Sequence, residues 1–113
     1  MRRFRYFGVY IGLLFAAALP CCGPVQASSA IAEGEKALEL ARLADAEKLA
    51  SYPYYRAEAY LHIAKTKEGF AEYEIAAEYA KEALKAAENS LVICRKRAAL
   101  KKAQEERNRG GGK

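Results

Sequence analysis

The chain has 113 residues and a formal net charge of +5. Its length allows one small domain, near the size at which a single core is only marginally sufficient. The charge is uneven, because residues 22–90 hold eight Lys/Arg and twelve Asp/Glu whereas residues 91–113 hold eight and two, so the overall value does not by itself indicate a nucleic-acid-binding domain.

The N-terminal segment has the pattern of an export signal. Arg2, Arg3 and Arg5 precede an apolar run over residues 9–19. A secretory signal combines such a positive front with an apolar core of about 7–15 residues. A helix of this run is roughly 16 Å long, well short of a ~30 Å hydrocarbon core. We therefore expect residues 1–21 to be a signal peptide that is removed.

Two cleavage sites fit the sequence after this run. Leu19-Pro20-Cys21-Cys22 looks like a lipobox, in which Cys22 becomes acylated and begins the mature chain. Val25-Gln26-Ala27 instead offers small residues for ordinary signal peptidase, which would release a soluble periplasmic protein that starts at Ser28. The first alternative predicts a lipid anchor, and the second predicts none.

A first helix is expected over residues 30–50. Residues 22–29 are predicted to be a tether, with Ser28 or Ser29 as the helix cap. The apolar residues then recur at i, i+3, i+4 and i+7, the spacing of one helix face; they are Ala37, Leu40, Ala41 and Ala44. We expect this helix to end at Ser51-Tyr52-Pro53, since a residue before proline is disfavoured in the helical region.

Two further helices follow. The second is expected over residues 53–68, with Gly69 as its stop. The third is expected over residues 72–107, and its apolar stripe continues through Cys94, which we interpret as a small apolar helix residue. The helical domain thus covers residues 30–108, and residues 109–113 are predicted to be a disordered tail.

These elements predict an all-α fold. Short turns between neighbouring helices favour an antiparallel helical hairpin array of about three helices with a long C-terminal helix. The segment Phe70-Ala71-Glu72-Tyr73, followed by alanines at 76, 80 and 83, resembles the second half of a tetratricopeptide repeat. That resemblance implies a repeat-like helical hairpin, although at least three repeats are normally needed to form a solenoid.

The sequence offers no recognisable catalytic or metal-binding apparatus. His62 is the only histidine, whereas a zinc site or a catalytic dyad needs further ligands at fixed spacing. The carboxylates at 72, 74, 78 and 82 are interleaved with Lys81 and Lys85 and indicate a charged, solvent-exposed helix face. No glycine-rich phosphate loop is present. We therefore expect a protein that is not an enzyme and needs no metal and no cofactor.

Two groups of side chains are candidates for binding a partner. The tyrosines around the first turn could form an aromatic patch or could fill the gap where the helices diverge. The basic tail could contact an acidic protein or an anionic envelope surface, or could be a solvated helix end favoured by the helix dipole. Nucleic acid is not expected as a partner, since the chain is exported and the tail has no aromatic residue for stacking. The candidates are Tyr52, Tyr54, Tyr55, Tyr60, Lys101 and Lys102.

A second resemblance covers nearly the whole mature chain. Four segments look like those of short alanine-rich bacterial lipoproteins: Cys22-Gly23-Pro24-Val25-Gln26, Ala37 to Ala50, Tyr52 to Leu61, and Gly69-Phe70-Ala71-Glu72-Tyr73. They form an uncharacterised family, a domain of unknown function that sometimes lies beside OmpA-type modules. The resemblance implies that Cys22 is acylated and that Gly23 permits sorting to the outer membrane. It implies no activity.

Taken together, the sequence predicts a non-enzymatic lipoprotein on the periplasmic face of the outer membrane. It would act as an adaptor or spacer through contacts with another envelope protein. The alternative is a soluble periplasmic binding or chaperone-like protein that is cleaved after Ala27.

Overall fold

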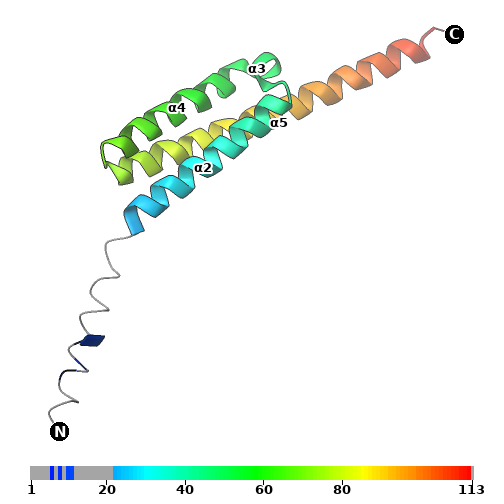
Figure 1. Ribbon diagram of the computed structural model, residues 1–113. Helices are drawn as coiled ribbons and strands as arrows, with labels where there is room; N and C mark the ends of the chain where they lie inside the picture. The colour runs from blue at the N-terminus through cyan, green and yellow to red at the C-terminus, as the bar shows by residue number, and fades with distance from the viewer. Residues whose placement is uncertain (1–5, 7, 9, 12–21, 113) are drawn as a thin grey trace.

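A computed structural model of the chain describes residues 6, 8, 10, 11 and 22–112 (Figure 1). Its elements are α2 (Cys22–Leu43), α3 (Ala46–Leu49), α4 (Ser51–Gly69) and α5 (Tyr73–Gly110). Within residues 22–112 the protein contains helices and turns and no strand, so the predicted all-α class and the long C-terminal helix are confirmed. The predicted signal peptide lies almost entirely outside the described residues.

The three long helices run side by side (Figure 1). α4 is antiparallel to α2 and to α5, so α2 and α5 run in the same direction. α5 packs along both other long helices, whereas α2 and α4 contact each other less extensively. The short helix α3 connects α2 to α4 at the end of the bundle from which α5 emerges. The N-terminus of α2 and the α4–α5 turn lie at the opposite end.

The core consists of three clusters stacked along the bundle, and most of their members are alanine. The cluster at the N-terminal end of α2 contains Ala27, Ala76 and Ala77. The middle cluster contains Ile31, Leu61, Ala64, Ala80 and Ala83. The cluster beside α3 contains Ala41, Ala46, Ala50, Tyr54 and Cys94. The predicted alanine stripe of the third helix is therefore buried as expected, and Cys94 is a core residue, whereas Leu40 of the first stripe is 49% exposed.

Small side chains allow the helices to approach closely, and Gly34 marks the tightest contact. A Cβ atom at Gly34 would lie 3.0 Å from Cδ2 of Leu61 on α4 and 3.4 Å from the backbone oxygen of Ala80 on α5. Gly34 therefore lies where all three long helices meet. Its hydrogen in place of a methyl group lets α2 fit against the other two helices.

The first helix begins earlier than the sequence predicts. α2 starts at Cys22 and not near residue 30, so the segment predicted to be a tether is helical, and neither Ser28 nor Ser29 is its cap. The reason is tertiary packing, because Ala27 is fully buried against the alanines of α5. Pro24 is compatible with this helix since it lies in the first turn, where backbone N–H groups have no intrahelical partner.

The first helix also ends earlier, at Leu43 instead of Ala50. Asp45 adopts the left-handed conformation, with φ 60° and ψ 30°, and the single turn α3 follows. α4 then begins at Ser51, two residues before the predicted start. Pro53 fits its first turn because the first helical bond, from the Tyr54 N–H to the Ala50 carbonyl at 3.1 Å, comes after the proline.

The turn between α4 and α5 is a Schellman motif. The N–H of Glu72 donates to the carbonyl of Lys67 at 3.0 Å, and the N–H of Ala71 donates to that of Glu68 at 2.9 Å. Ala71 is the left-handed residue of this motif, with φ 60°. The sequence indicated the stop at Gly69, but the strained position is Ala71, and Gly69 has an ordinary negative φ.

α5 is much longer than its neighbours. Cys94 is its last buried residue, and every residue from Arg95 to Gly110 is exposed. We call residues 95–110 the distal arm (Figure 1). The arm is helical as far as Gly110, so the first two residues of the predicted disordered tail belong to α5. Among the described residues, no helix combines the length and the apolar character needed to cross a membrane.

Candidate functional site

The four candidate tyrosines do not form one patch. Tyr54 points into the core, where it is only 6% exposed and packs with Ala46, Ala50 and Cys94. Tyr55 lies edge-on to the Tyr54 ring, with 5.3 Å between ring centroids. Helical spacing explains the separation, because residues 54 and 55 project about 100° apart around α4. For Tyr54, burial fits the alternative in which the tyrosines fill space between the helices, and not the alternative of an exposed aromatic patch.

Tyr54 and Tyr55 both have a raised pKa. Burial raises the pKa of Tyr54, and the nearby carboxylates of Glu58 and Glu47 raise it further. The Tyr55 hydroxyl donates to the Glu47 carboxylate at 3.0 Å, and this hydrogen bond is the main cause of the raised pKa of Tyr55. These contacts join α4 to α3 and give both residues structural roles.

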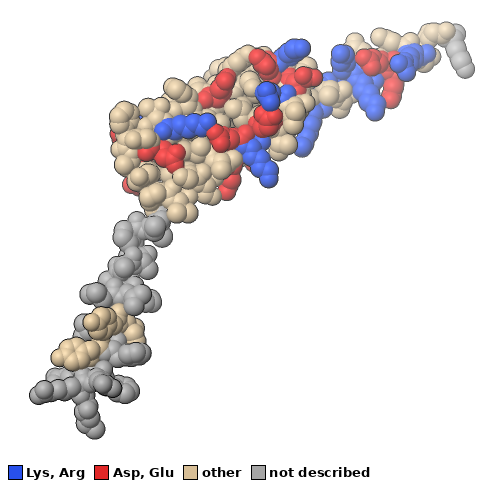
Figure 2. All heavy atoms as spheres, in the orientation of Figure 1, with Lys and Arg blue, Asp and Glu red and all other residues tan. Residues whose placement is uncertain are grey.

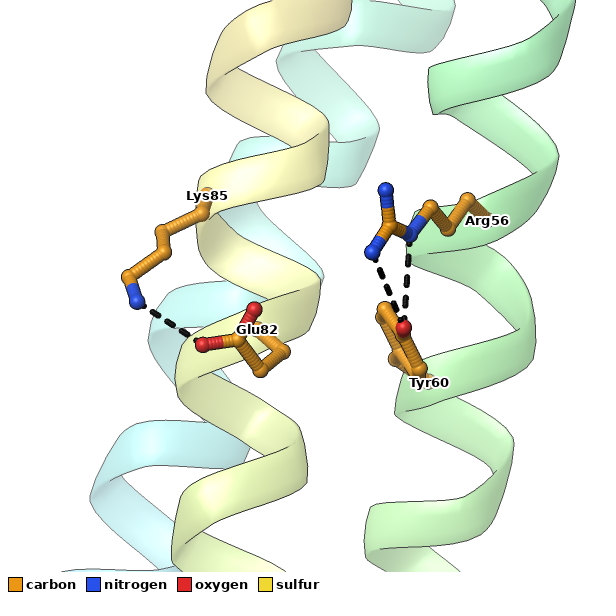
Figure 3. Close-up of polar contacts among 4 residues, drawn as sticks. All are labelled: Arg56, Tyr60, Glu82 and Lys85. Carbon is orange, nitrogen blue, oxygen red and sulfur yellow. Dashed lines mark hydrogen bonds and ion pairs between the residues drawn. The ribbon is translucent and has the colours of Figure 1, made fainter.

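Tyr52 and Tyr60 lie on another face of α4, facing α5. Tyr52 is 77% exposed and lines an open groove together with Arg56 of α4 and Glu82 of α5. Figure 3 shows Arg56 beside Tyr60, to whose hydroxyl it donates two hydrogen bonds of 3.1 and 3.3 Å.

The second wall of this groove carries its own ion pair. Lys85 is paired with Glu82 at 2.8 Å on α5 (Figure 3). The hydrogen bond from Lys85 is the main cause of the lowered pKa of Glu82. Tyr60 contacts α5 through its ring, whose centroid lies 5.9 Å from the ring centroid of Tyr79. The groove thus presents one fully available tyrosine, Tyr52, beside polar groups that are already hydrogen-bonded.

Lys101 and Lys102 line a basic notch where the distal arm leaves the bundle. The notch has a volume of about 480 Å³. One wall is formed by α3 and by Asp45, which precedes it, and the other wall is formed by the distal arm. The lining residues are Asp45, Lys48, Leu49, Arg97, Ala98, Lys101, Lys102 and Glu105. No ion pair connects either lysine to another side chain within residues 22–112. Both lysines are exposed, and their role in binding a partner stays a prediction.

Arg97 is the residue of this notch that the sequence analysis missed. Its guanidinium donates to the backbone carbonyl of Leu49, the last residue of α3. Carbonyls at a helix end lack an intrahelical partner, so this bond both caps α3 and fixes it to α5. The signal was present in the spacing, because residue 97 continues the buried series 87, 90 and 94 of α5.

A third groove lies between α2 and α4. Four of its charged residues form two ion pairs, one within α2 and one between α2 and α4. Arg42 donates two hydrogen bonds to Glu39, which lower the pKa of that carboxyl, and Lys65 of α4 pairs with Glu35 of α2. His62 lies at the same groove. The residues that the structure describes contain no group of three or more His, Cys, Asp or Glu side chains placed to hold a metal ion.

The predicted lipidation site is the first residue of α2. Gly23, which follows it, lies against α5, because a Cβ atom there would be 3.8 Å from Cβ of Tyr73. Cys22 is therefore directly continuous with the folded bundle. Figure 2 shows that Lys and Arg side chains gather on the distal arm and around its base, whereas the end of the bundle next to Cys22 is mostly uncharged in that view.

Comparison of this chain with protein families, with curated proteins and with solved structures finds no match. The geometry described above is therefore the basis for a functional proposal.

Proposed function

We propose that this protein is a non-enzymatic, lipid-anchored adaptor or spacer on the periplasmic face of a bacterial outer membrane. The anchor is an acyl group on Cys22, as the resemblance to short alanine-rich lipoproteins implies. The observation that carries the proposal is the placement of the two ends. α2 starts at Cys22, and the parallel helix α5 carries the distal arm out of the opposite end of the bundle.

This placement determines how far the arm can reach. α5 has 38 residues, and at 1.5 Å per residue it is about 57 Å long. The arm accounts for about 24 Å of that length. Because no flexible segment separates Cys22 from the bundle, an acyl group there would hold this end of the bundle at the membrane, and the arm leaves from the opposite end.

The arm and the basic notch are the surfaces that best suit a protein partner. The arm carries seven Lys/Arg and two Asp/Glu, so it favours an acidic surface on another envelope protein. Confinement at a membrane raises the effective concentration of such a small domain near its partner. The grooves described above are open and shallow and suit contact with a protein surface.

The alternative is a soluble periplasmic protein cleaved after Ala27. Cleavage there would remove Ala27, which is fully buried and packs against Ala76 and Ala77. It would also remove the contact between Gly23 and Tyr73. The loss of these contacts at one end of the bundle favours cleavage before Cys22.

Metabolic labelling with an alkyne fatty acid tests the anchor. We expect the wild-type protein to incorporate the label, the variant Cys22→Ser to lose it and the matched control Cys21→Ser to retain it. N-terminal sequencing of the mature protein provides an independent readout. A mature chain that starts at Ser28 and carries no label would contradict the proposal and support the soluble alternative.

Site-specific photocrosslinking in intact cells tests the adaptor role. A photoreactive amino acid at Lys101 should give a specific adduct, and the same amino acid at Ala59, an exposed site on α4, should not. Tyr54 is unsuitable for this experiment because it is buried. Equal labelling from both positions, or no adduct from Lys101, would count against the arm as the partner-binding surface.

A further inference from the structure

The end of the bundle that carries Cys22 also carries three exposed apolar side chains. Phe70 in the α4–α5 turn is 71% exposed, Val25 in the first turn of α2 is 64% exposed and Ile75 near the start of α5 is 40% exposed. We call these three residues the apolar tip. They come from three different segments, and an aromatic ring exposed at the end of a turn is expensive to leave in water.

Packing places these residues at one end of the molecule. The beginnings of α2 and α5 touch each other, since Gly23 lies beside Tyr73 and Ala27 packs against Ala76. The α4–α5 turn, which holds Phe70, directly precedes α5. The apolar tip is therefore at the same end as Cys22, and the distal arm is at the other (Figure 1).

Two of the carboxylates nearest the tip are already partnered. Glu68 accepts a hydrogen bond from Ser28, and Glu72 is paired with Lys67 at 2.9 Å. In Figure 2 this end is mostly free of charged side chains, although Glu74 is also exposed in the first turn of α5. Partnered carboxylates are less costly to bring near a low-dielectric surface than isolated ones.

We propose that the apolar tip is a membrane-contacting surface, and that Phe70 and Val25 insert at the headgroup–acyl boundary of the bilayer that holds the Cys22 lipid. This inference rests on the proposed function. The occupant of the tip is a lipid surface because Cys22 is the first residue of the same helix as Val25, with no tether between them. An acyl group at that position would bring this end of the bundle to the bilayer surface.

Insertion of the apolar tip would fix the orientation of the bundle on the membrane, in addition to its attachment through the lipid. A lipid on a single residue fixes a position but leaves the bundle free to tilt. Apolar side chains buried in the interface add to the membrane affinity of a lipid anchor. With contacts from α2, from the α4–α5 turn and from α5, the bundle stands with its arm directed away from the bilayer.

The chain contains no tryptophan, which makes the test specific. The variant Phe70→Trp places the only tryptophan of the protein at the tip, and Val25→Trp provides a second reporter. The matched control is Leu100→Trp, because Leu100 is also highly exposed, at 70%, but lies on the distal arm. Each mature acylated protein, which begins at Cys22, is reconstituted into phosphatidylethanolamine–phosphatidylcholine vesicles with and without brominated acyl chains.

We expect brominated lipid to reduce the fluorescence of both tip tryptophans about twofold or more, with a blue-shifted emission, and to leave the Leu100→Trp signal unchanged. Acylated protein that floats with the vesicles but shows no quenching at either tip position would overturn this inference and leave the lipid anchor intact. A blue shift that appears without vesicles as protein concentration rises would also overturn it, because the occupant would then be a second copy of the chain. Protein that carries no lipid and fails to float would remove the proposed function and this inference together.

Discussion

Gly34 lies at a close contact between α2 and the other two long helices. It lies in the middle of α2, where glycine is normally unfavourable, yet a Cβ atom there would come within 3.0 Å of Leu61. Leu61 is only 4% exposed, so its side chain has little room to move. Gly34 therefore lowers the intrinsic stability of α2 but allows the helices to approach closely.

We expect Gly34→Val to lower the free energy of unfolding by about 2 kcal/mol, because the added methyl groups would overpack the contact with Leu61 and Ala80. Urea denaturation followed by circular dichroism measures this change. Ala32→Val is the matched control, since Ala32 is exposed on the same helix and the substitution adds the same β-branched side chain. Equal effects of the two variants would show that helix propensity, and not packing, governs position 34.

Tyr54 gives the stability a dependence on alkaline pH. Burial raises the pKa of Tyr54 above its ordinary value of 10.0, so the folded state holds the phenolic proton more tightly than the unfolded state. The stabilising contribution is complete below the unfolded pKa and is lost as pH rises through the higher folded pKa. The free energy of unfolding should therefore fall as the pH rises above about 10, the pKa of tyrosine in the unfolded chain.

The variant Tyr54→Phe should show a smaller decrease over the same pH range, because it has no hydroxyl to ionise. Urea denaturation at each pH measures the difference between the two proteins. Tyr52→Phe serves as the control, since Tyr52 is 77% exposed, and it should follow the wild-type curve. Identical pH curves for the wild type and Tyr54→Phe would exclude Tyr54 as the source.

At the scale of elements, the α4–α5 turn contains an avoidable strain. Ala71 occupies the left-handed position of the Schellman motif, which glycine adopts at least cost. We expect Ala71→Gly to raise the free energy of unfolding by about 0.5–1 kcal/mol. Thermal denaturation measures the change. Ala59→Gly in the exposed interior of α4 is the control and should lower the free energy by about 1 kcal/mol; two shifts of the same sign would contradict this account of the turn.

The distal arm contributes length to α5 and little to the fold. No residue after Cys94 is buried, and Arg97 makes the last contact with α3. A chain that ends after Ala98 should therefore keep its free energy of unfolding within about 0.5 kcal/mol of the full-length value. A chain that ends after Leu91 should lose considerably more, because it lacks Cys94 of the core. A large loss in the chain that ends after Ala98 would contradict this prediction and reveal a structural role for the arm.

At the scale of the whole molecule, the position of the mature N-terminus affects stability. A chain that starts at Ser28 lacks Ala27 and should unfold with a free energy lower by about 1–2 kcal/mol. A chain that starts at Pro24 removes only Cys22 and Gly23 from α2 and serves as the control. Urea denaturation of the two proteins provides the comparison, and equal stabilities would remove the structural argument against cleavage after Ala27.

The sequence predicts the bundle better than it predicts its boundaries. Alanines at 76, 80, 83 and 87 repeat with helical spacing, and all are buried, because periodicity directly reflects which face is covered. The start of α2 at Cys22 depends on packing against α5, and the break at Asp45 depends on one left-handed residue. Neither cause is visible in the local sequence. Pro53, which was expected to mark the end of the first helix, therefore lies ten residues after the observed end at Leu43.

The sequence predicted only part of the candidate site. Lys101 and Lys102 lie beyond the last buried residue and are exposed, as a basic tail suggests. The tyrosines are close in sequence but differ in their direction around α4, so Tyr54 became a core residue and Tyr52 stayed exposed. Arg97 was overlooked because its partner is a backbone carbonyl, which leaves no charge pattern in the sequence.

The parallel alignment of α2 and α5 has a mechanical consequence. A pull between the first residue of α2 and the end of α5 would draw the two helices past each other lengthwise. The contacts from Ala27 to Cys94 would then bear the load simultaneously instead of opening one after another. In this shear geometry many contacts must break at once, so lengthwise separation of the two ends is opposed by the whole core and not by one cluster at a time.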